Sequence, residues 1–180
     1  MKKLITAVTA LIALAGPAAA GEFSVTSADM ADGLLKPAQF ANAFGCTGGN
    51  LSPAIAWSGA PAGTKSFVVT MYDKDAPTGS GFWHWVVVDV PADVTMLPPG
   101  AGNAASLLPK GARMTMTDAG QPGFVGACPP PGQTHEYSIT VKALKVDSLP
   151  LPDNATAAMV GFVSNMNTLA TATIVAKGSR

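Results

Sequence analysis

The sequence has few charged residues and only two histidines. Of its 180 residues 12% are charged, and 11 Lys and Arg balance 11 Asp and Glu. No basic run is present, so the chain lacks the positive stripe with which nucleic-acid-binding proteins track phosphates. No apolar run reaches the roughly 20 residues that a helix needs to cross a bilayer. The composition therefore predicts neither a nucleic-acid-binding nor a membrane-spanning protein.

The first 20 residues predict an export signal. A short basic start, residues 1–3, precedes an uncharged apolar stretch, residues 4–15, and residues 18–20 provide the small-x-small pattern that signal peptidase accepts. The alternative is an amphipathic or core helix, but such a helix would have no polar face. We expect cleavage before Gly21, a periplasmic or secreted location, and a single domain over residues 21–180.

The chain has two cysteines, Cys46 and Cys128. In an oxidising export compartment, a pair with no third partner predicts a disulfide. It would close a loop of about 80 residues, to which chain-entropy models assign roughly 4 kcal/mol. Two buried thiols or a metal pair are the alternatives. Metal binding is disfavoured because the chain has no Cys-x-x-Cys motif and no histidine near the cysteines. We therefore predict no metal and no cofactor.

Short β-rich runs separated by turns dominate the rest of the chain, which holds 19 Gly and 15 Pro. This pattern is typical of a mostly β fold, here an antiparallel β-sandwich with a few short helices. The expected strands are residues 23–27, 55–57, 66–72, 84–90, 112–117, 134–144 and 171–175.

One helix is predicted near the C-terminus, over residues 155–169, with Asp153 or Asn154 as its N-cap. Apolar residues recur there at helical spacing and are expected to face the core. They are Met159, Phe162, Val163 and Met166.

The two histidines, His84 and His135, lie at or near the starts of predicted strands. A lone histidine on a strand is usually structural, so the argument depends on its neighbours. Side chains alternate between faces along a strand. His135 and Tyr137 should therefore point the same way, while Trp83 and Trp85 should share the face opposite to His84.

Two carboxylates are placed to join this group. Asp73 and Asp75 follow the strand at 66–72, and Pro77 favours a turn back toward the next strand. Asp73 or Asp75 is therefore expected near His84. Two imidazoles, a phenol and a carboxylate that converge at strand ends predict a pocket for a small anion. In this interpretation His84, His135 and Tyr137 donate hydrogen bonds and Asp73 orients an imidazole.

Three segments, residues 73–77, 83–85 and 132–137, resemble the signature regions of the phosphatidylethanolamine-binding proteins, also called Raf kinase inhibitor proteins. Residues 44–57 and 61–66 resemble the bacterial branch of that family. The resemblance implies an antiparallel β-sandwich and a surface pocket for phosphate-like or other small anions. It assigns the pocket to Asp73, His84, His135 and Tyr137, with Asp75, Ala76 and Pro77 at its rim.

The resemblance also implies a binding protein rather than an enzyme. Family members are mostly regulators or inhibitors of kinases and proteases, and some form dimers. We therefore expect a small anionic ligand, or an anionic group of a protein partner, with a homodimer as one expected assembly. The chain departs from the family at Lys74, where proline is common, and at Glu136, where arginine is common. By strand alternation Glu136 should face away from the pocket.

Two other functions stay open. A metal- or carboxylate-assisted hydrolase could use the same pocket residues, although no Gly-x-Ser-x-Gly nucleophile motif is present. A structural or adhesive protein with an unused pocket is the third possibility.

Overall fold

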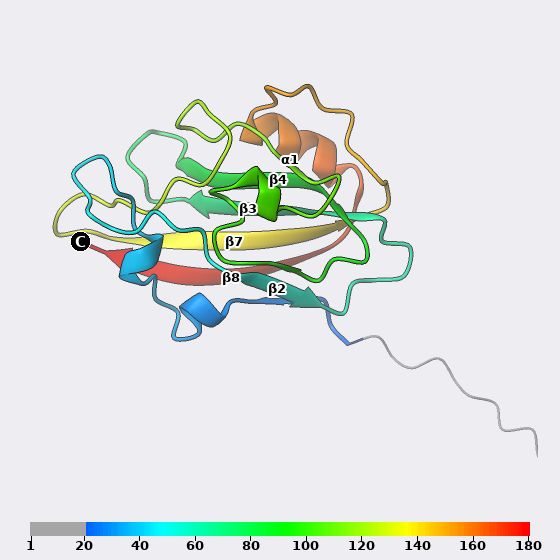
Figure 1. The fold of residues 1–180 in the computed structure, drawn as a ribbon, viewed down its shortest axis with the longest axis horizontal. Coiled ribbons are helices and arrows are strands. Elements are labelled where there is room, and N and C mark those ends of the chain that lie inside the picture. Colours follow the sequence, from blue (N-terminus) through cyan, green and yellow to red (C-terminus); the bar gives the residue numbers. More distant parts are fainter. Residues whose placement is uncertain (1–20) are drawn as a thin grey trace, which may run out of the picture.

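Two antiparallel sheets make up the protein, whose structure is a computed structural model that describes residues 21–180 (Figure 1). The smaller sheet has the strand order β1-β2-β5 and the larger one β6-β4-β3-β7-β8. This architecture confirms the predicted mostly β sandwich. The elements are β1 (Ser24–Thr26), η1 (Ala28–Met30), η2 (Pro37–Gln39), β2 (Ile55–Ser58), β3 (Ser66–Asp73), β4 (Phe82–Pro91), β5 (Met96–Leu97), η3 (Ala105–Leu107), β6 (Arg113–Met114), β7 (Thr134–Leu144), α1 (Ala157–Asn165) and β8 (Thr168–Ser179).

The predicted export signal at residues 1–20 lies outside the described residues. Within residues 21–180, no helix has the length and apolar character needed to cross a bilayer.

The main core lies between the two sheets. Alternate residues of β3, namely Phe67, Val69 and Met71, pack in one apolar cluster with Ile55 and Trp57 of β2. All five are at most 4% exposed. Burial of such side chains contributes about 1.5–3 kcal/mol each, so this interface between the sheets fixes which face of β3 and β7 points inward.

A second apolar cluster lies on the outer face of the larger sheet. There Val68 of β3 and Val86 of β4 pack in one cluster with Val160 of α1. Figure 1 shows α1 beside β4, away from β8. The helix therefore covers mainly the β3 and β4 part of this outer face, and its C-terminal end contacts Lys142 of β7.

The helix is shorter than predicted and begins later. Its N-cap is Thr156, whose Oγ1 accepts a hydrogen bond from Met159 N at 3.3 Å, so neither Asp153 nor Asn154 caps it. The hydroxyl of a threonine satisfies a free N–H of the first turn.

The expectation that the large apolar side chains of this helix face the core is wrong for three of the four. Met159, Phe162 and Met166 are 45%, 69% and 57% exposed. The buried residues of α1 are Ala157, Val160 and Ser164. Small side chains allow the helix to approach the sheet closely, and the large ones are left on the solvent side.

A bulge in β4 overturns the predicted alternation around His84. Met71 pairs with Trp85 and the next residue, Tyr72, pairs with Trp83, so His84 is an extra, unpaired residue of β4 between these two pairs. Such a bulge redirects side chains at the end of a strand. Trp85 lies in the main core, whereas Trp83 packs against Tyr72 in a tilted arrangement with ring centroids 4.4 Å apart. The two tryptophans thus lie on opposite faces.

The short strand β5 was not predicted, and strand lengths differ most from expectation at two places. β8 extends over Thr168–Ser179 rather than 171–175, because it pairs with β7 along nearly its whole length. Only Arg113–Met114 of the predicted strand at 112–117 forms β6.

Candidate functional site

A cavity of about 240 Å³ opens at the end of the sandwich where β3 ends and β4 and β7 begin. This histidine cavity is lined by Phe44, Asp73, Ala76, Pro77, Thr78, Phe82, His84, Val125, Gly126, Cys128, Pro130 and His135. Of the six predicted ligand-binding residues, the structure places Asp73, Pro77, His84 and His135 on its wall. Asp75 and Tyr137 do not line it.

Asp73 is the last residue of β3 and is only 3% exposed. Its Oδ1 accepts hydrogen bonds from the backbone N–H groups of Asp75 at 2.8 Å and Ala76 at 3.0 Å, which forms a tight turn after the strand. Its Oδ2 accepts a hydrogen bond from His135 Nδ1 at 2.7 Å. The buried carboxylate is thus held by three donors.

His135 is fixed through both ring nitrogens. Nδ1 donates to Asp73, and Nε2 lies 3.0 Å from Gln133 Oε1. A ligand that bonds to Nε2 has to displace the Gln133 side chain. Gln133 was not among the predicted site residues, although its position two residues before His135 places it on the same face of the strand.

His84 has a different hydrogen-bonding state. Its Nδ1 lies 2.7 Å from the Val125 carbonyl oxygen, which can only accept, so Nδ1 carries the proton. Its Nε2 lies 4.0 Å from Asp73 Oδ2 and has no hydrogen-bond partner among the described residues. Burial lowers the pKa of His84, outweighing Val125 and Asp73, which act to raise it.

The neutral imidazole of His84 therefore turns a lone pair, not a donor, toward the carboxylate side of the cavity. The Val125 carbonyl fixes this tautomer from 41 residues away in the sequence. Donation from His84 Nε2 to a ligand would need a second proton on this ring, so the expectation that both histidines donate stays a prediction.

Tyr137 supports the imidazoles from within the core. It is 0% exposed, and its ring lies edge-on to His84 at 5.3 Å. Its hydroxyl has no hydrogen-bond partner among residues 21–180. Burial, followed by the charge of Asp73, raises the pKa of Tyr137 far above its ordinary value, so the phenol stays protonated.

A surface charge cluster holds Asp75 outside the cavity. Asp75 Oδ2 accepts a hydrogen bond from Glu136 N at 2.8 Å, and Lys74 Nζ lies 3.0 Å from Asp75 Oδ1 and 3.0 Å from Glu136 Oε2. The Glu136 N–H first, and then Lys74, lower the pKa of Asp75. Lys74 and Glu136, the two departures from the family pattern, pair with each other here.

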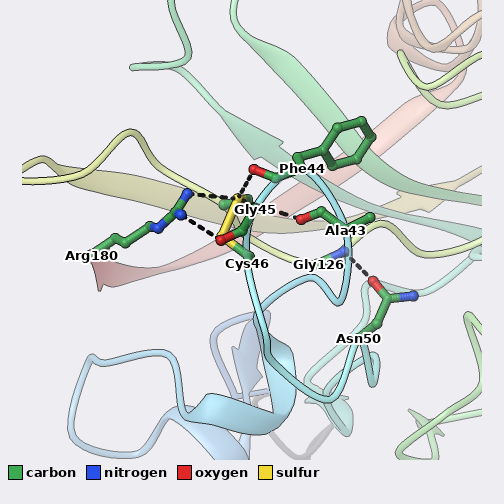
Figure 2. Close-up of a disulfide and its surroundings, with 8 residues drawn as sticks. Ala43, Phe44, Gly45, Cys46, Asn50, Gly126 and Arg180 are labelled. Atoms are coloured by element: carbon green, nitrogen blue, oxygen red, sulfur yellow. Dashed lines mark hydrogen bonds between the residues drawn. A yellow bond between two sulfur atoms is a disulfide. The ribbon is translucent and has the colours of Figure 1, made fainter.

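The disulfide predicted between Cys46 and Cys128 is present and builds the mouth of the cavity. It joins the loop that carries Phe44 to the wall at Cys128. Phe44 is 71% exposed and adopts a left-handed backbone conformation with φ of 57°. Figure 2 shows Arg180 beside this junction, where its guanidinium donates to the Gly45 carbonyl and to Cys128 Sγ.

Gly126 lets the wall approach this loop closely. A Cβ at this position would lie 2.4 Å from Ala41 N and 2.5 Å from Phe40 C. Its N–H donates to Asn50 Oδ1 at 2.8 Å, as Figure 2 shows. Val125 and Gly126 were not predicted from the sequence, because their roles come from tertiary contacts.

No group of three or more His, Cys, Asp or Glu side chains within residues 21–180 is arranged to hold a metal ion.

Comparison with known proteins gives consistent matches. The family model described as phosphatidylethanolamine-binding protein matches residues 26–179. YbcL of Escherichia coli (strain K12) is 49% identical over 177 residues, which cover 97% of this chain and 96% of that protein. YbhB of the same organism is 50% identical over 151 residues, which cover 83% of this chain and 96% of that protein.

The comparison also includes a solved structure of YbcL and a relative named as a lipoprotein. The crystal structure of E. coli YbcL, described as a new member of the mammalian PEBP family, has a TM-score of 0.85 and 48% identity, covering 89% of this chain and 99% of that one. LppC of Mycobacterium tuberculosis, whose name describes it as a lipoprotein, is 36% identical over 143 residues, which cover 78% of this chain and 64% of that protein. The chain belongs to the phosphatidylethanolamine-binding protein family.

Proposed function

We propose that this protein is an exported, non-enzymatic binding protein whose histidine cavity takes a small oxyanion, as a free ligand or as an anionic group of a protein partner. The observation that carries the proposal is the buried His84 Nε2, which has no hydrogen-bond partner among the described residues and belongs to a residue of the cavity wall. Buried polar atoms in folded proteins are rarely left unpaired. A ligand atom that bonds to this nitrogen explains why the protein itself leaves it without a partner.

The protonation state of His84 defines the ligand chemistry. Because Nδ1 holds the proton and burial favours the neutral ring, Nε2 needs a donor. A protonated oxyanion such as hydrogen phosphate can supply one, or His84 can take up a proton as the anion binds. In both cases a proton enters the site with the ligand.

The sign of the pH dependence follows from this coupling. The free protein has a lowered pKa at His84, and a bound anion raises it. Between these two values the complex holds more protons than the free protein, so affinity increases as pH falls. When one proton is taken up, the affinity changes by at most tenfold per pH unit.

The mouth of the cavity adds an apolar contact surface. Phe44, Phe82 and Pro130 surround the polar floor made by Asp73 and His135. This arrangement suits an anion carried on an apolar group, such as a phosphorylated or carboxylate side chain of a kinase- or protease-type partner. Inhibition of such a partner is the proposed role.

Export is supported by two observations. The disulfide between Cys46 and Cys128 is typical of oxidising compartments. A relative carries the name of a lipoprotein. With the signal-like residues 1–20, these observations favour the periplasm.

The hydrolase alternative gains no support from the geometry. Paired carboxylates would have to face one cavity, but Asp75 is held outside by Glu136 N and Lys74.

Titration of the protein with inorganic phosphate by NMR between pH 5.5 and 8 tests the proposal. We expect shifts of the His84 and His135 ring signals and an affinity that increases as pH falls. His84→Gln should remove the pH dependence, whereas the matched surface variant Asp147→Asn should retain it. Millimolar phosphate that moves neither ring would disprove the proposal.

A further inference from the structure

A second cavity, which we call the Lys142 groove, lies on the outer face of the larger sheet. It holds about 130 Å³ between α1 and the side chains of β3, β4 and β7. The histidine cavity lies on the inner face of the same strands, and the two share no lining residue.

Lys142 forms one end of the groove. Its Nζ donates to Asn165 Oδ1 at 2.6 Å and to Ser164 Oγ at 3.3 Å. An ammonium has three N–H groups, so one is left for another acceptor. Within residues 21–180, no carboxylate oxygen lies within 4.0 Å of this ammonium.

The surroundings offer no compensating charge. Residues 154–176, which form α1 and most of β8, contain no charged side chain. The in-register neighbours of Lys142 are Val68 and Thr171. Burial lowers the pKa of Lys142, which agrees with an ammonium that has no carboxylate beside it.

The floor and far end of the groove are suited to a flat or short apolar body. Thr70, Ser138 and Thr140 contribute small side chains to its lining, and the tilted, contacting rings of Tyr72 and Trp83 close the far end. Ser138 and Lys142 are four residues apart on β7, a distance of roughly 13 Å along a strand.

The helix side of the groove is kept open by a glycine. Gly161 lines the groove, and a Cβ built on it would meet no atom within 4 Å. Packing therefore does not require glycine here, although glycine in a helix interior is unfavourable. A larger side chain would enter the space that a ligand needs.

We propose that the Lys142 groove binds a small aryl or alkyl carboxylate. The carboxylate accepts from Lys142 Nζ, and the apolar body lies along the floor toward Tyr72 and Trp83. A single cation in a groove without further charges matches one negative charge, and this favours a carboxylate over a phosphate dianion.

A purely structural role for Lys142 would be to offset the partial negative charge at the C-terminus of α1. In that role an ammonium bonds to the last backbone carbonyls. Here both bonds go to side-chain oxygens, of Ser164 and Asn165, and these side chains hold the amine at the groove.

Titration of the full chain with benzoate, followed by amide NMR, tests the proposal. We expect shifts at Thr140 and Gly161, and at least tenfold weaker binding of benzyl alcohol, which lacks the charge. Lys142→Met should weaken benzoate binding at least tenfold. Gly161→Leu should abolish it without altering the cation, and His84→Gln should leave it unchanged.

Three results would overturn the proposal. The first is that about 20 mM benzoate, ample for a weak carboxylate site, shifts none of the groove amides. The second is that benzoate shifts only residues of the histidine cavity. The third is that the Lys142→Met and Gly161→Leu variants bind benzoate with unchanged affinity. Thermal melting of each variant shows that a loss of binding is not a loss of fold.

Discussion

The histidine cavity and the Lys142 groove are built from the same three strands on opposite faces of one sheet. β3 supplies Asp73 to the first and Tyr72 to the second. β4 does the same with His84 and Trp83, because adjacent residues of a strand point to opposite faces. Adjacent residues of a strand can thus serve two chemically different cavities.

The two cavities differ most in how they treat charge. In the histidine cavity the Asp73 carboxylate bonds to His135 and to two backbone N–H groups. In the groove, the Lys142 ammonium has only neutral partners within the described part of the chain. We therefore expect ligand affinity in the histidine cavity to depend on pH, and ligand affinity in the Lys142 groove to depend on the single Lys142 cation.

Removal of the disulfide should have the largest effect and should separate the two cavities. Cys46→Ser with Cys128→Ser removes a link across 82 residues, for which the chain-entropy model predicts a loss of about 4 kcal/mol in the free energy of unfolding. Phosphate affinity should fall because Phe44 and Cys128 line that cavity. Benzoate binding should not change, since neither residue lines the groove. Denaturant unfolding and both titrations provide the measurements, and equal losses at both cavities would contradict this separation.

Loss of the Asp73 carboxylate should be the next most damaging change. Asp73→Ala leaves His135 Nδ1 and the N–H groups of Asp75 and Ala76 without their acceptor. Loss of a buried, charged acceptor costs about 3 kcal/mol, measurable by denaturant unfolding. Asp75→Ala is the matched control and should lose much less, because that side chain lies in the surface charge cluster. Equal losses in the two variants would refute this account of Asp73.

Sequence reasoning could locate the strands because they follow local rules, and the disulfide because the chain has only two cysteines. Turn residues mark the strand ends, and strand alternation explains why His135 points inward while Glu136 pairs with Lys74 on the outside. The family resemblance implied the antiparallel sandwich, while the strand order comes from the structure.

The remaining features depend on contacts that a single sequence does not reveal. The bulge at His84 breaks the alternation that the sequence suggests, and the tautomer of His84 depends on the distant Val125 carbonyl. The large side chains of α1 match an amphipathic pattern, yet the helix packs through Ala157 and Val160 because small residues permit close approach.

Gln133 offers a smaller test of the histidine cavity. Its side chain occupies His135 Nε2, so a ligand that uses this nitrogen has to break that contact. Gln133→Ala should raise phosphate affinity about fivefold, which corresponds to the roughly 1 kcal/mol of one net hydrogen bond. Gln121→Ala is the control, since Gln121 does not line the cavity. Titration calorimetry measures the change, and weaker binding would instead mean that Gln133 itself contacts the ligand.

Gly161→Ala should produce the smallest effect and tests the groove through stability. Alanine is favoured over glycine in a helix interior by up to about 1 kcal/mol, and its Cβ meets no atom within 4 Å. The variant should therefore unfold at higher denaturant concentration. A methyl group should narrow the groove and weaken benzoate binding a few-fold, while phosphate binding stays unchanged. A gain in stability with unchanged benzoate binding would mean that the ligand does not pass beneath Gly161, and the proposed position of its apolar body would then be wrong.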